Sequence, residues 1–226
     1  MKSFLNPDSP IMSFFGLIFD FIWLNVLTLL LCLPIITAGA SITAMYAGLI
    51  RMIRGNDTKL TQHFFHDFKV NFKKSTLLWL IFLAFGIILY LEFGLVRQMK
   101  DGTGSLLRIM LLVVAVFILA ASSTTFMMQS HFENTVAATL RNGFTLVLAR
   151  FPIVLISTLI EVFFLYFLFH YPVQMIFLFI GCGFTFPAYL EVLLMNRTLW
   201  KLEGKDPDEE KKRLKRGDDS WLQSEK

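Results

Sequence analysis

Two acidic residues inside apolar stretches of the sequence are the best candidates for chemistry. Asp20 and Glu161 each lie about nine residues from one end of an apolar run, hence roughly 13 Å deep in a helix. A carboxyl group in membrane hydrocarbon is costly, so each is a candidate functional group. No Lys or Arg lies within the apolar run of either acid to pair with it, and Asn25 is a nearby polar residue. The pattern predicts an intramembrane polar site of Asp20, Asn25 and Glu161 for a proton, ion or polar solute. The alternative is interhelical hydrogen bonding by protonated acids.

Two further acids lie nearer the ends of apolar runs. Glu92 precedes Arg97 by five residues, and Glu191 precedes Arg197 by six. Long side chains near helix ends reach the membrane interface, where they meet water or an opposite charge. We therefore interpret Glu92 and Glu191 as interfacial or ion-paired residues.

The remaining residues of chemical interest give little support for catalysis. His63, His66 and Asp67 could face one side of a helix, but no third strong ligand is evident, so we expect no metal and no cofactor. No hydrolase, zinc-protease, phosphate-binding or dinucleotide-binding motif is present. The sequence therefore favours a protein that is not an enzyme.

The elements that hold these residues are predicted from the distribution of apolar residues. Hydrophobic residues form 55% of the 226-residue chain and charged residues only 17%, below the roughly 25% of typical soluble domains. Runs of about 20 apolar residues are long enough to cross a bilayer as helices. We predict an all-α, polytopic transmembrane bundle with spans at about 11–33, 35–53, 76–96, 106–128, 152–169 and 173–195. Residues 1–200 would form this domain and residues 201–226 a charged tail.

The second span, 35–53, is short and rich in small residues. Ala40, Ala44 and Gly48 recur every four residues and would form one helix-packing face, because small side chains let helix backbones approach closely. A re-entrant helix is the alternative for this segment. The chain would then have five spans, with its N-terminus on the opposite side of the membrane.

Two loops are predicted to form short interfacial helices on the cytoplasmic side. Each has large apolar residues at helical spacing beside basic residues, as in amphipathic surface helices. The first set is Leu60, Phe64, Phe68 and Phe72, with Lys69, Lys73 and Lys74; the second is Leu140, Phe144 and Leu148, with Arg141.

Charge fixes the orientation of the loops. With six spans, 18 of the 21 Lys and Arg residues fall on one side of the membrane and three, Arg97, Lys100 and Arg108, on the other. The positive-inside rule places the basic loops and the C-terminus in the cytoplasm. This topology explains the positive charge, so nucleic-acid binding is not expected.

Two motifs of this chain resemble the YesL family of bacterial integral membrane proteins, a domain of unknown function. One runs from Leu33 to Gly39 and on to Tyr46, and the other is the basic segment 68–74. The motif residues are Pro34, Thr37, Gly39, Tyr46, Asn71 and Phe72. At these positions Pro34 would end one helix, Thr37 would be the N-cap of the next, and Gly39 would permit close backbone approach.

The resemblance implies a multi-pass protein of the bacterial plasma membrane that works beside carbohydrate-uptake systems. Partners would be the lipid bilayer and a sugar ABC-transporter permease or a sensor kinase, with a homo-oligomer as a further alternative. The leading hypothesis is thus a non-enzymatic accessory to carbohydrate uptake or its signalling. The second is a small transporter or channel for a polar solute or proton that uses mid-membrane carboxylates.

Overall fold

The computed structural model describes residues 10–55, 59–99 and 101–216, and within them every regular element is a helix. The predictions for the side of the N-terminus and for the end of the tail concern residues 1–9 and 217–226, which lie outside this range. The elements are α1 (Pro10–Cys32), the 3₁₀ turn η1 (Ile35–Thr37), α2 (Ala38–Ile53), α3 (Leu60–Val96), α4 (Gly102–His131), α5 (Val136–Ala149), α6 (Phe151–His170), α7 (Pro172–Cys182), α8 (Thr185–Leu202) and α9 (Pro207–Arg216).

Six helical stretches within the described residues are long and apolar enough to cross a membrane, which confirms the predicted class. They are Phe15–Cys32, Ile35–Ile53, Leu60–Val96, Gly102–His131, Phe151–His170 and Ile176–Leu202. Their outer surfaces expose many large apolar side chains, as a lipid environment requires.

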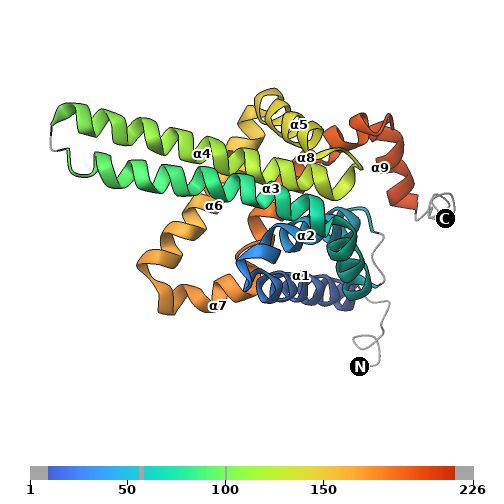
Figure 1. Ribbon diagram of the computed structural model, residues 1–226. Coiled ribbons are helices and arrows are strands. Elements are labelled where there is room, and N and C mark those ends of the chain that lie inside the picture. The colour runs from blue at the N-terminus through green and yellow to red at the C-terminus, as the bar shows by residue number, and fades with distance from the viewer. Residues whose placement is uncertain (1–9, 56–58, 100, 217–226) are drawn as a thin grey trace.

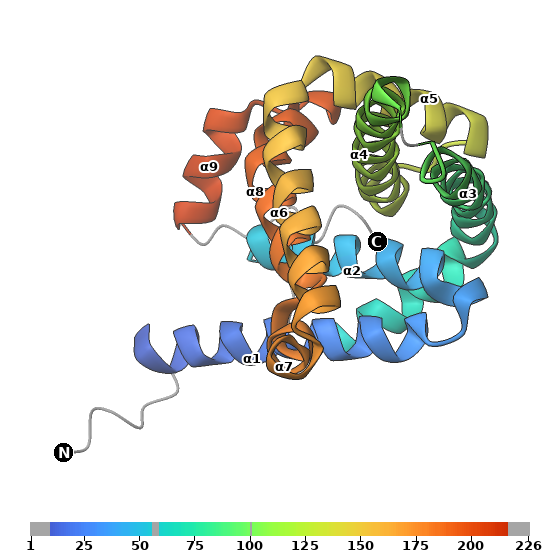
Figure 2. The same cartoon turned by 90° about the vertical axis from the view of Figure 1, so that its left-hand side faces the viewer.

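The long helix α3 connects two helix pairs that run in different directions. Its first half packs antiparallel along α2, where Leu60 lies near Gly48 and Ser75 lies near Gly39. Its second half pairs with α4, and the two extend together beyond the other helices (Figure 1). Figure 2 shows α3 and α4 nearly end-on, with α1 and α2 crossing their direction. Helix α2 therefore lies in the middle of the molecule and has most of its residues buried.

The two predicted interfacial segments have different outcomes. Residues 60–74 are the first turns of α3 and not a separate short helix, and Leu60 and Phe64 are buried in the protein core. Part of this apolar face is therefore covered by other helices of the protein, chiefly α2. The second segment is a separate helix, α5, whose Gly143 packs closely against Thr125 of α4.

The predicted sixth span is broken. Residues 173–195 were expected to form one helix, but α7 ends at Cys182 and α8 begins at Thr185. The intervening Gly183 and Phe184 lie against α1, and the two helices leave this junction in different directions (Figure 1). The break matters because it forms part of the wall of the cavity described next.

Candidate functional site

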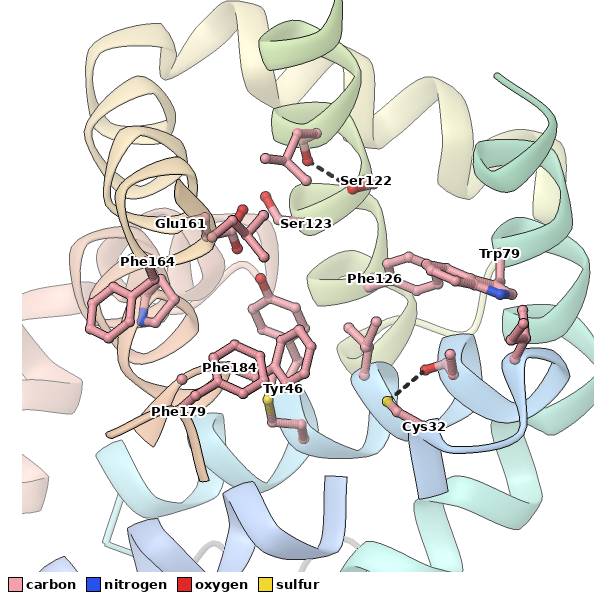
Figure 3. Close-up of a pocket in the computed structure, with 18 residues that line it drawn as sticks. Cys32, Tyr46, Trp79, Ser122, Ser123, Phe126, Glu161, Phe164, Phe179 and Phe184 are labelled. Atoms are coloured by element: carbon pink, nitrogen blue, oxygen red, sulfur yellow. Dashed lines mark hydrogen bonds between the residues drawn. The ribbon is translucent and has the colours of Figure 1, made fainter. Parts of the chain in front are cut away.

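A cavity of about 350 Å³ lies where α2, α4, α6 and the α7–α8 junction meet (Figure 3). Most of its wall is aromatic or aliphatic, and the polar side chains that line it are few. Besides the Cys32 thiol and the Trp79 indole, they are Tyr46 from α2, Ser122 and Ser123 from α4, and Glu161 from α6. This is the usual composition of a small-molecule site, in which an apolar wall carries a few polar groups.

A buried hydrogen-bonded cluster lies beside this wall. Glu191 of α8 is 1% exposed, and its Oε2 accepts a hydrogen bond from the Tyr46 hydroxyl at 2.7 Å. Ser123 Oγ lies 3.2 Å from Glu191 Oε1 and can donate to it. The expectation that Glu191 is interfacial is therefore wrong, and Arg197 instead approaches Asp208 of α9 at 3.8 Å. Three helices that are distant in sequence are joined by this one carboxyl group.

Glu161 has a different environment from Glu191. Its Oε2 is shielded from solvent and has no hydrogen-bond partner among the described residues. Its carboxyl group points toward the hydroxyls of Tyr46 and Ser123 (Figure 3) and is close enough to Glu191 for their charges to interact. A buried polar atom without a partner is rare and needs an explanation. Asp20, expected at the same depth, is half-buried on α1 and does not line the cavity.

Asn25 of α1 holds the break between α7 and α8. Its Nδ2 donates to the carbonyls of Phe179 and Ile180 at 2.9 and 2.7 Å, and its Oδ1 accepts from the N–H groups of Phe184 and Thr185 at 3.0 and 3.1 Å. One side chain thus bonds to the end of one helix and to the start of the next, where backbone groups run short of partners within their own helices. The structure places Asn25 behind the cavity wall, where it fixes the shape of the wall.

The small-residue face of α2 is used inside the protein. Ala40 and Ala44 are fully buried, and Gly48 lies so close to Leu24 of α1 that a Cβ atom would meet its methyl groups at 3.1 and 3.3 Å. At Gly39 a Cβ atom would overlap the backbone of α3. The face therefore brings α1, α2 and α3 together and does not form an exposed groove.

The remaining motif residues also make internal contacts. Thr37 is not a side-chain N-cap, because its hydroxyl donates back to the carbonyls of Leu31 and Pro34, at the end of α1. Asn71 Oδ1 accepts from Gln129 of α4 at 3.0 Å, which links α3 to α4. Phe72 packs edge-on against Phe68 on the same helix. These residues make contacts within or between helices, whereas Tyr46 is the motif residue that lines the cavity.

A charged cluster joins the ends of α2, α4 and α8, and its Glu203 and Arg54 lie just beyond the spans. Glu203 Oε1 lies 2.6 Å from Arg54 and 2.5 Å from His131, its Oε2 lies 3.2 Å from Lys205, and Arg54 stacks over Trp200. Burial alone would raise the pKa of Glu203, but hydrogen bonds from His131 and Arg54 and their positive charge lower it to about 2. The ionised carboxylate fixes the ends of three helices.

Within the described residues, no three His, Cys, Asp or Glu side chains come together as metal ligands. Asp67, which follows the two histidines on α3, pairs with Arg51 at 2.6 Å. The site brings together two carboxyl groups, two hydroxyls and an apolar cavity.

Comparison with known proteins adds one finding. No curated protein and no solved structure matched the chain. The model of a family described as "Protein of unknown function, DUF624" matches residues 21–93, about a third of the chain. This region contains both motifs of the YesL resemblance, runs from α1 to α3, and includes Asn25 and Tyr46. The chain is thus similar, over its first three helices, to the DUF624 family.

Proposed function

We propose that this protein is a small membrane transporter that binds its solute in the cavity between α2, α4, α6 and the α7–α8 junction. The observation that carries the proposal is the Oε2 atom of Glu161, which is buried in the cavity wall and has no hydrogen-bond partner in the part of the chain that the structure describes. An unsatisfied carboxyl oxygen destabilises the protein unless something else fills its hydrogen-bonding capacity. A solute in the cavity would do so, and a proton could replace it when the solute leaves.

The broken helix supports transport over simple structural packing. Discontinuous helices in transporters place free backbone groups at the substrate site and let one part of the bundle move against another. Here Phe179, Gly183 and Phe184 belong to both the α7–α8 junction and the cavity wall. A change in the angle between α7 and α8 would alter the cavity directly. The proposal includes no catalytic step.

Charge supports the orientation of the proposed transporter. Arg97 and Arg108 belong to the tip where α3 meets α4, whereas α9 and the Glu203 cluster lie toward the other end of α4 (Figure 1). We place the α9 end in the cytoplasm of a bacterial cell and the tip outside, by the positive-inside rule. The chain would be a multi-pass protein of the plasma membrane.

A second candidate function is an accessory role in carbohydrate uptake or its signalling. The match to the DUF624 family is consistent with the YesL resemblance, which implies a sugar ABC-transporter permease or a sensor kinase as a partner. The buried small-residue face of α2 gives this role no docking surface. A partner, or a second copy of the chain, would have to use another surface.

The transporter proposal is tested by blocking the cavity. Ser122 lines it and donates only to Leu119 of its own helix, so Ser122→Phe would fill space at little cost in hydrogen bonding. Ser130 makes the same kind of bond, to Met127 of α4, and does not line the cavity, so Ser130→Phe is the matched control.

The measurement is native mass spectrometry of protein extracted into nanodiscs from its own membrane. The wild type and Ser130→Phe should carry a discrete small-molecule adduct that Ser122→Phe lacks. An adduct pattern identical in all three proteins, or no adduct in any, would reject the cavity as a solute site. Copurification of a permease with all three would instead support the accessory role.

A further inference from the structure

Three helices contribute oxygen atoms to one end of the cavity, and Glu191 of α8 lies directly behind them. Glu161 and Glu191 provide carboxyl groups, while Tyr46 and Ser123 provide hydroxyls that can donate to Glu191. Both hydroxyls lie toward Glu161 as well (Figure 3). Glu191 has donors within bonding distance of both its oxygens, whereas Glu161 Oε2 has none among the described residues. Glu161 is therefore the carboxyl group that is left for a ligand.

The two carboxyl groups have no basic side chain beside them among the described residues. The ion pairs of the described residues lie elsewhere, around Arg51, Arg54, Arg197 and Arg213. Two neighbouring carboxyl groups in a low-dielectric region cannot both stay ionised unless a positive charge accompanies them. A ligand that carries one positive charge would supply it.

The rest of the cavity selects the body of the ligand. Aromatic rings form much of its wall: Tyr46, Trp79, Phe126, Phe164, Phe179 and Phe184. Aromatic faces attract organic cations, most strongly where water is excluded. An inorganic cation is a poor fit, because small metal ions need about six oxygen ligands or retained water and the wall offers few oxygens. A cavity of about 350 Å³ falls within the size range of small-ligand sites.

We infer that the solute is a monovalent organic cation with a small apolar body, and that Glu161 is its counter-ion. This inference rests on the proposed solute-binding function and names its substrate class. The ammonium group lies beside Glu161, in reach of the ring of Tyr46, and the apolar body extends along the aromatic wall. Glu191 keeps its two hydroxyl donors and adds to the negative potential.

The test uses two probes of the same shape. Benzyltrimethylammonium is a cation, and neopentylbenzene is its neutral counterpart with carbon in place of nitrogen. Binding of each to protein in nanodiscs is measured by equilibrium dialysis, with empty nanodiscs subtracted. The proteins are the wild type, Glu161→Gln, Ser122→Phe, and Glu92→Gln, which removes an exposed carboxyl group of α3 outside the cavity. Thermal unfolding of each variant reports whether it is folded.

The wild type and Glu92→Gln should bind benzyltrimethylammonium saturably and in preference to neopentylbenzene. Glu161→Gln should weaken the cation about tenfold or more and leave the neutral probe unchanged, since only the charge is lost. If Glu161→Gln does not fold, Glu161→Asp replaces it and should retain the preference for the cation.

The two proposals fail in different ways. If the wild type binds neopentylbenzene as well as the cation, and only Ser122→Phe abolishes binding, the solute site stands and the cationic class is wrong. If Ser122→Phe binds both probes like the wild type, the cavity is not a solute site and both proposals fail. Equal loss of both probes in Glu161→Gln would also overturn the counter-ion role.

Discussion

Replacing Asn25 with leucine tests whether α1 holds the broken helix in place. The leucine side chain has the same number and branching of heavy atoms but can neither donate nor accept a hydrogen bond. The change removes the bonds to two carbonyls of α7 and from two N–H groups at the start of α8, all between 2.7 and 3.1 Å. Since Asn25 is fully buried, water cannot replace them without opening the structure.

The cost follows from the groups left without partners. The N–H groups of Phe184 and Thr185 would lose the acceptor that Asn25 provides, at about 1–3 kcal/mol each. The carbonyl of Phe179 also accepts from Gly183 at 2.9 Å, so the α7 side adds less. The range is about 2–6 kcal/mol, and hydrogen bonds measured in membrane proteins favour its lower part. We expect Asn25→Leu to lower the free energy of unfolding by about 3 kcal/mol.

The assay is reversible unfolding in bicelles, and the free energy of unfolding is measured by steric trapping. Thr28→Val is the matched control, because Thr28 is equally buried one turn along α1 but its hydroxyl donates only to the carbonyl of Leu24 in its own helix. It should cost less than about 1 kcal/mol. Asn25→Asp retains the acceptor for α8 but would face the α7 carbonyls, so it should fall between the two. If Asn25→Leu costs no more than Thr28→Val, the role assigned to Asn25 is refuted.

Two other predictions concern helix packing and charge. Gly39→Ala would place a methyl group against the backbone of α3 and should lower thermal stability by several degrees, whereas Gly86→Ala, which has open space, should leave it unchanged or raise it. If Gly86→Ala lowered thermal stability more than Gly39→Ala, the result would contradict the close α2–α3 contact. The pKa of Glu203 is about 2 in the folded protein against an ordinary 4.5, so the unfolded state binds more protons between these values. Stability should therefore fall by about 3 kcal/mol as the pH drops through this window. Glu203→Gln should remove that dependence, and an unchanged pH profile in the variant would argue against the cluster.

The helices were predictable because apolar run length is a local property of the sequence. The spans predicted at 11–33 and 35–53 agree with α1 and with η1–α2. The helix predicted around Phe144 is α5. The separate helix at 60–74 was not found, since Leu60 and Phe64 pack on α2 and the helix continues without interruption. Apolar residues at helical spacing indicate a buried face, but they do not show whether lipid or another helix covers it.

The cavity depended on contacts that no local pattern records. The break after Cys182 is stabilised by Asn25, more than 150 residues earlier, so hydropathy alone predicted a continuous span. Glu191 seemed interfacial by its position, yet the break and the fold bring it to Tyr46. The sequence singled out Glu161 as an intramembrane acid, but its neighbours come from helices α2, α4 and α8 and could not be derived from spacing. Gly183 within the apolar run is a local signal of the break, as are Gly181 and Pro187.

The most direct test of the central claim is whether a small solute reaches the cavity from water. In protein with Cys32→Ala and Cys182→Ala, a single cysteine at Ser122 lines the cavity, and one at Val113, a residue 65% exposed on the outer face of α4, is the lipid-facing control. Modification by a water-soluble methanethiosulfonate is measured in intact membranes. Ser122→Cys should react at least about tenfold faster than Val113→Cys, because thiolates form only where water enters, and benzyltrimethylammonium should slow it. Equal rates at both positions, without protection, would contradict a solute-accessible cavity at the broken helix.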